Sequence, residues 1–209
     1  MATPPSFFPD TELTPTQKKS RELSDLADRH IKSARNNPDI SVEKRNKIIA
    51  RAYLDLKDGL DQLEASTKRA ADARRSELER SVYGIPNKAD ASAMISYRDA
   101  LDRASQVEKE AAAVDLYKRA QTSGDDLLAR AVLATAYQNQ WVNVINNHAE
   151  LYPETDAQLN ELWNAQSGFM GGGLFDFVAP VPNEIRNHTE SSLRVMAEGE
   201  TPTASIQVF

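Results

Sequence analysis

The chain has 209 residues, enough for one substantial domain, and its composition favours helices over a β fold. Hydrophobic residues make up 40% of it, charged residues 27% and aromatic residues only 7%, with 8 glycines. The net charge of −6 disfavours a general nucleic-acid-binding protein, which needs a surplus of lysine and arginine on one face. The absence of cysteine excludes disulfides, thiolate metal sites and cysteine nucleophiles.

Residues 1–13 are predicted to form an extended N-terminal arm, because they contain three prolines and no helical pattern. The adjacent aromatics Phe7 and Phe8 either anchor this arm on another protein or fold back on the chain's own helices. The arm lacks the basic start and apolar core of a secretory signal, and no window of the sequence approaches the length of a membrane span. We therefore expect a soluble protein that is made and used without export.

Residues 14–166 are predicted to form a helical bundle. Its first helix begins after Thr14, since Thr14 and Gln17 have the spacing of a reciprocal capping box. This helix is expected to end at residues 36–38, where two asparagines precede a proline.

The second helix is predicted over residues 41–83, a stretch with no helix breaker stronger than Gly59. Its apolar residues alternate in steps of four and three, which is typical of a coiled-coil seam. The seam consists of Ile49, Tyr53, Leu56, Leu60, Leu63, Thr67 and Ala70. A helix of about 40 residues extends roughly 60 Å at 1.5 Å per residue, so we expect part of it to stay uncovered by the chain itself.

Two further helices and a short one are expected before the bundle ends. After a stop at Gly84, apolar residues between 94 and 114 predict a third helix, and the short connection favours an antiparallel return along the second. Residues 125–152 predict one helix that is apolar on more than one side, so we expect the others to pack around it. Pro153 ends it, and a short helix follows up to Gln166.

Residues 167–209 are predicted to form a glycine-hinged apolar segment and an extended C-terminal tail. The run Gly171–Gly173 lacks the preceding strand and the following lysine of a phosphate-binding loop, so it indicates a hinge. One or two helical turns are expected around residues 192–197. The last residues either pair with a strand edge or fray as an ordinary terminus.

No catalytic, cofactor-binding or metal-binding pattern is found in the sequence. The histidines His30, His148 and His188 lie far apart and have no partner at a metal-ligand spacing, so His148 is interpreted as structural. Asp125 and Asp126 lie at a predicted helix start, where negative charge is favourable without any acid–base role. We therefore predict a protein that is not an enzyme and holds no cofactor or metal.

Apolar residues near both ends of the chain are the candidate partner-binding residues, because an exposed apolar segment usually marks a binding surface. They are Phe7, Phe8, Phe169, Met170, Leu174, Phe175, Phe177, Val178, Ile206, Val208 and Phe209. They predict a component of a larger assembly.

Two segments in the middle of the chain resemble a known family: SYRDALDRA (Ser96–Ala104) and YKRAQTSGDDLLARAVLATAYQNQWVNVINNHAELYPE (Tyr117–Glu154). They are similar to small helical proteins encoded among the head genes of tailed bacteriophages of actinobacteria. The resemblance rests on packing and capping residues, so it transfers no catalytic residue. It implies a role in the virion or its assembly, at the capsid or the head–tail junction.

The sequence thus predicts an all-α, elongated antiparallel helical bundle or coiled-coil hairpin with extended N- and C-terminal arms. The expected function is that of a non-enzymatic structural protein of the virion, present in the host cytoplasm during assembly. Its expected partners are other virion proteins, the major capsid or the portal/connector protein, in an oligomeric assembly without membrane or nucleic acid.

Two other functions stay open at this point. An acidic helical chain also suits a scaffolding or assembly chaperone protein, which leaves before the particle matures. A cellular adaptor is the other possibility, and it would form homodimers through the seam residues Ile49, Leu56 and Leu63.

Overall fold

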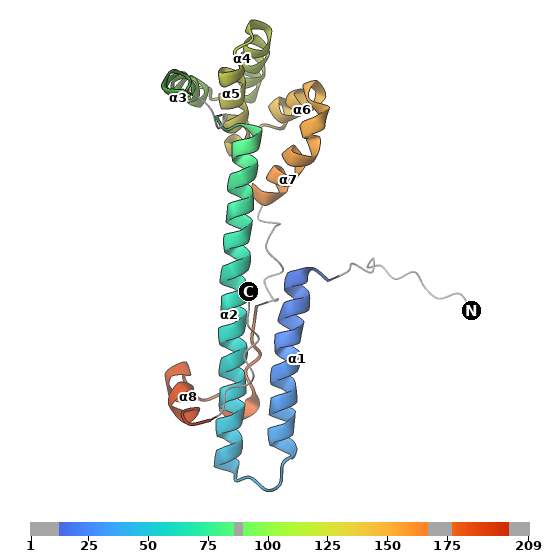
Figure 1. Cartoon of the computed structure of the whole chain (residues 1–209), viewed down its shortest axis with the longest axis vertical. Coiled ribbons are helices and arrows are strands. Elements are labelled where there is room, and N and C mark those ends of the chain that lie inside the picture. Colours follow the sequence, from blue (N-terminus) through green and yellow to red (C-terminus); the bar gives the residue numbers. More distant parts are fainter. Residues whose placement is uncertain (1–12, 86–89, 167–176, 201–209) are drawn as a thin grey trace, which may run out of the picture. The chain divides into compact units, whose positions relative to one another are not determined.

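The computed structural model describes residues 13–85, 90–166 and 177–200, and every regular element within these ranges is helical (Figure 1). The prediction of an all-α protein is therefore confirmed for the part of the chain that the structure describes. None of its helices is both long and apolar enough to cross a membrane.

The chain divides into two compact units. Unit 1 combines Met1–Arg69 with Gly171–Phe209, and unit 2 comprises Ala70–Met170. The boundary falls inside the helix α2 (Val42–Val82), which contributes to both units. The region 14–166, predicted as one bundle, is thus shared between two units.

Unit 1 is built on α1 (Pro15–Asn36) and the first part of α2. The predicted capping box is confirmed: the Thr14 hydroxyl accepts from the Gln17 amide at 3.2 Å, and the Gln17 side chain accepts from the Thr14 amide at 3.0 Å. The predicted end of this helix is also confirmed, with Asn37 as its C-cap. The second helix, predicted over residues 41–83, is likewise confirmed as the single helix α2.

The contacts between α1 and α2 show that they run in opposite directions within unit 1. The guanidinium of Arg45, near the start of α2, donates to the carbonyl of Ala34, near the end of α1. Further along α2, a Cβ added to Gly59 would lie 3.2 Å from a methyl group of Leu23, near the start of α1. Their facing apolar residues form most of the core of unit 1.

A C-terminal segment completes unit 1, and we call its described residues 177–200 the C-terminal strap. It contains η2 (Asn183–Ile185) and α8 (Glu190–Met196), which confirms the helical turns predicted near its end. Its residues Ile185, Leu193 and Ala197 are buried in one cluster with residues of α1 and α2. The predicted extended tail is therefore wrong for residues 177–200, because two helices alone leave apolar surface that the strap covers.

Unit 2 surrounds α5 (Asp126–Asn139) with the end of α2 and the remaining helices. These are α3 (Ala91–Ser105), α4 (Glu110–Ser123), α6 (Val142–Leu151), η1 (Pro153–Thr155) and α7 (Asp156–Gln166). Every residue of α5 from 131 to 137 is buried, so the prediction of an apolar central helix is confirmed for this part. The most extensive helix–helix packing in the described part of unit 2 is that between α3 and α5.

The helix predicted over residues 125–152 is in fact two helices. Gln140 adopts a left-handed conformation with φ 58°, and the Trp141 amide donates to the Ala136 carbonyl at 2.8 Å, so α5 ends there. Trp141, the N-cap residue of α6, packs against the core of unit 2.

The predicted third helix is also divided, into α3 and α4, by residues 106–109. It does not return along the second helix, because α3 packs mainly on α5. Figure 1 accordingly shows α3 nearly end-on, while α2 lies in the plane of the view. The short connection after α2 therefore leads into a crossing and not into an antiparallel pair.

The break at Gln140 leads to a first testable prediction. A left-handed residue with a Cβ costs roughly 1 kcal/mol, whereas glycine adopts this conformation freely. We expect Gln140→Gly to raise the free energy of unfolding by about 0.5–1 kcal/mol in urea titrations. Gln140→Ala is the matched control and should not stabilise the protein, since it keeps the Cβ.

Candidate functional site

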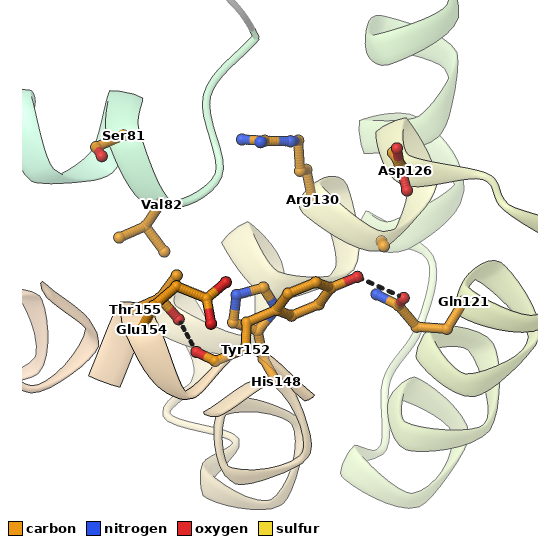
Figure 2. Close-up of a pocket in the computed structure, with 10 residues that line it drawn as sticks. Ser81, Val82, Gln121, Asp126, Arg130, His148, Tyr152, Glu154 and Thr155 are labelled. Atoms are coloured by element: carbon orange, nitrogen blue, oxygen red, sulfur yellow. Dashed lines mark hydrogen bonds between the residues drawn. The ribbon is translucent and has the colours of Figure 1, made fainter. Parts of the chain in front are cut away.

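The ends of several helices in unit 2 line a pocket of about 270 Å³ (Figure 2). The last turn of α2, the end of α4, the first turns of α5, the end of α6 and η1 contribute its lining residues. These segments are far apart in sequence, so the pocket exists only in the folded unit.

A chain of hydrogen bonds between four side chains forms one side of the pocket. The Tyr152 hydroxyl donates to the Gln121 side-chain oxygen at 3.0 Å, and the Gln121 amide group donates to the Tyr117 hydroxyl oxygen at 3.0 Å. The Tyr117 hydroxyl lies 2.6 Å from Nδ1 of His148. Because the Tyr117 oxygen already accepts a hydrogen bond, its own hydrogen is free to be donated to Nδ1, which places the imidazole proton on Nε2.

Burial keeps both ends of the Tyr117–His148 bond uncharged. Burial lowers the pKa of His148 below its ordinary value, the positive charge of Arg130 lowers it further, and Glu154 acts in the opposite direction. Burial likewise raises the pKa of Tyr117, although the hydrogen bond from Gln121 opposes this shift. At neutral pH the pair is therefore a neutral imidazole and a protonated phenol, as expected for a half-buried histidine and a buried tyrosine that join α6 to α4.

Charged side chains line the rest of the pocket. The guanidinium of Arg130 on α5 donates to the carbonyl of Gly84 at 3.0 Å, which joins α5 to the end of α2. Asp126 and Glu154 are exposed pocket residues. Asp125, beside the pocket, caps α5 by accepting from the Leu128 amide at 3.0 Å, so its predicted position at a helix start is confirmed.

The hydroxyl groups of the pocket bind neighbouring groups of the protein. Ser81 donates to the side chain of Gln158 at 3.2 Å, and Thr155 donates to the carbonyl of Tyr152 at 2.7 Å. His148 therefore has a tyrosine, and no serine or threonine, at its Nδ1. Within the ranges that the structure describes, no group of three or more histidine, aspartate or glutamate residues could hold a metal ion. The pocket's observed contacts are those that hold its helices together.

The lowered pKa of His148 predicts that acid destabilises unit 2. Below about pH 6.5, the ordinary pKa of histidine, the unfolded chain binds a proton that the folded protein binds only at lower pH. The stabilisation is complete above this value and is lost as the pH falls through the folded pKa. We expect the melting temperature to fall less between pH 7.5 and 5 in His148→Asn than in the wild type. Asn146→Ala, which changes an exposed residue of the same helix, should show the same fall in melting temperature between pH 7.5 and 5 as the wild type.

The structure describes only two of the candidate partner-binding residues, Phe177 and Val178. Phe177 packs against the apolar cluster of α1 and α2, so it makes a contact within the chain, while Val178 is 60% exposed. The other candidates lie outside the described residues: Phe7, Phe8, Phe169, Met170, Leu174, Phe175, Ile206, Val208 and Phe209.

Sequence reasoning missed two features that the fold creates. Tyr117 and His148 are 31 residues apart and on different helices, so no local spacing relates them. The ion pairs of the C-terminal strap join residues separated by 133 positions, for Lys57 and Glu190, to 156 positions, for Lys44 and Glu200. Of the strap residues, only Phe177 and Val178 were predicted from the sequence to bind a partner.

Comparison of the chain with protein-family models, with curated protein sequences and with solved structures gives no match.

Proposed function

We propose that the chain is a non-enzymatic structural component of a tailed-phage virion, located at the capsid or the head–tail junction. The observation that carries this proposal is the construction of the chain from two units, each with its own core, on the common helix α2. Such a chain offers two separate surfaces to neighbouring proteins, which suits a component of an assembly.

The resemblance to phage head proteins supports the same proposal. Its two segments, Ser96–Ala104 and Tyr117–Glu154, lie entirely within unit 2. They supply most of the buried residues of its core, including Ala100, Tyr117 and Tyr137. The likeness therefore concerns residues that determine how a whole unit folds. The elongated form and the extended N-terminal arm predicted from the sequence belong to this proposal as well.

The contacts of α2 disfavour the adaptor function. A homodimer through the seam would need Ile49, Leu56 and Leu63 at the surface. All three are buried in unit 1 by α1 and the strap, with exposed fractions of 0%, 6% and 6%. A second chain could reach them only if unit 1 opened.

Mass spectrometry of particles from a phage-producing culture tests the proposal. We expect the chain in mature particles at a fixed ratio to the major capsid protein. Presence in precursor particles and loss on maturation would identify a scaffolding protein instead. Absence from both kinds of particle would overturn the virion proposal.

A variant of the N-terminal arm tests how the chain is incorporated. We expect Phe7→Ala combined with Phe8→Ala to reduce the amount of the chain in particles, because the two aromatic side chains are the proposed anchors. The matched control combines Thr3→Ala with Ser6→Ala, which alters the same arm without removing an aromatic ring. Equal incorporation of both double variants would contradict anchoring by this arm.

A further inference from the structure

Ion pairs join the C-terminal strap to α1 and α2, and the strap contributes the acid in some of them and the base in another. Arg35 binds Glu184 through two hydrogen bonds of 2.7 and 2.9 Å, and Arg194 of α8 binds Asp58 with a shortest distance of 2.8 Å. Lys44 and Lys57 of α2 also form ion pairs with the strap. Their partners are Glu200 at 2.8 Å and Glu190 at 3.5 Å. In these pairs the strap thus contributes three glutamates and one arginine, and α1 and α2 contribute one arginine, two lysines and one aspartate.

This arrangement makes the α1–α2 surface selective for one sequence. Exposed ion pairs contribute little to affinity, but they disfavour alignments that bring like charges together. A strap shifted along the helices would place Arg194 near a lysine or an acid near Asp58. Its buried residues Ile185 and Leu193 must also enter the apolar cluster at the same time. The surface therefore fits the strap of this chain, whichever copy supplies it.

We propose that, in an assembly of several copies, the α1–α2 surface of one copy binds the strap of a second copy. The exchanged strap makes the same contacts as the intramolecular one, so exchange costs little beyond the entropy of association. The strap is attached to unit 2 and not directly to α2, because the chain passes through all of unit 2 before it returns. In dilute solution the chain's own strap is present at a higher effective concentration than the strap of any other copy, which favours the intramolecular contact. In an assembly, the straps of neighbouring copies are also held close to the α1–α2 surface, so this difference becomes smaller. The multi-copy setting rests on the proposed virion function, although the exchange itself does not.

Two charge-reversed chains test the exchange with the full-length protein. Arg35→Glu leaves two acids facing each other within one chain, and Glu184→Arg leaves two arginines facing each other. In a mixture, each chain can exchange its strap with the other, and both pairs then become attractive. Only strap exchange restores both pairs, since neither chain can correct its own.

We expect the mixture, refolded together with one chain labelled with ¹⁵N, to form a mixed dimer in native mass spectrometry. Its association constant should exceed that of either variant alone by about tenfold or more. The control is the single chain that carries both Arg35→Glu and Glu184→Arg, which restores the pair internally and should stay monomeric. A mixture that remains the sum of two monomers would overturn the proposal.

A second pair of variants tests the same exchange if the first pair fails to fold. Asp58→Arg and Arg194→Asp alter side chains that are 42% and 49% exposed, so neither change buries a charge. Circular dichroism should show wild-type helix content for each, and their mixture should again form a mixed dimer. This experiment is independent of particle incorporation: a mixed dimer from a chain absent from particles would support exchange and refute the virion role. Incorporation into particles without any mixed dimer would support the virion role and refute strap exchange.

Discussion

Replacing Tyr137 by alanine is expected to cost about 3–5 kcal/mol of unfolding free energy, as for other large aromatic residues in protein cores. Tyr137 is 1% exposed at the centre of unit 2. Its ring contacts the rings of Tyr83 and Trp163, with centroids 5.9 and 6.3 Å away. Its hydroxyl donates to the Leu159 carbonyl at 2.9 Å. Tyr137→Ala therefore removes contacts to α7 and to Tyr83, the residue after α2, and leaves a cavity beside α5.

Tyr137→Phe is the matched control, because it keeps the ring and removes only the hydroxyl. It should cost about 0.5–1.5 kcal/mol, the net value of one hydrogen bond. Urea unfolding followed by circular dichroism measures both changes, with tyrosine and tryptophan fluorescence as a second probe of unit 2. If the alanine and phenylalanine variants lost the same stability, the ring would not be a core contact and the packing of unit 2 would be wrong.

Local signals explain which helices could be predicted from the sequence. The start of α1 depends on Thr14 and Gln17, three residues apart, and the end of α1 on the asparagines before Pro38. Such short-range hydrogen bonds and backbone restrictions are visible in one sequence. The single helix α2 was predictable for the same reason, since nothing between its ends interrupts the apolar pattern.

The break between α5 and α6 could not be predicted in this way. Gln140 is neither glycine nor proline, yet it adopts a left-handed conformation that ends α5. Both flanking stretches continue the apolar pattern of one helix, so periodicity alone favours an uninterrupted helix. The tertiary contacts of Trp141 with the core of unit 2 compensate the local cost, and no local pattern carries that information.

The candidate site was less predictable than the fold because its parts are far apart in the chain. His148 was correctly interpreted as a residue of a helix face, but its partner Tyr117 lies on α4. Phe177 was recognised as an apolar residue of the C-terminal segment, and it contacts the chain's own helices. Ile185, which the sequence did not single out, contacts them as well. Hydrophobic composition predicts that a segment will be buried, but not which surface buries it.

Replacing Ile185 by alanine is expected to release the C-terminal strap from unit 1. Ile185 is fully buried in η2 and packs with residues of α1, α2 and α8, so its loss should cost about 2–5 kcal/mol of the stability of unit 1. Hydrogen exchange should then increase in α1 and the first part of α2. The amides of α5 should keep their protection, because the core of unit 2 contains no strap residue.

Two control variants make this result specific for the strap. Ile185→Val removes one methylene and should cost only about 0.5–1.5 kcal/mol. Val181→Ala changes a residue of the strap that is 46% exposed and should leave the exchange rates of α1 nearly unchanged. If Ile185→Ala increased exchange in α5 as much as in α1, the two units would unfold as one and would not have separate cores. Unchanged exchange in α1 would mean that the strap contributes nothing to unit 1, and the α1–α2 surface would then lose its role as a binding site for a second copy.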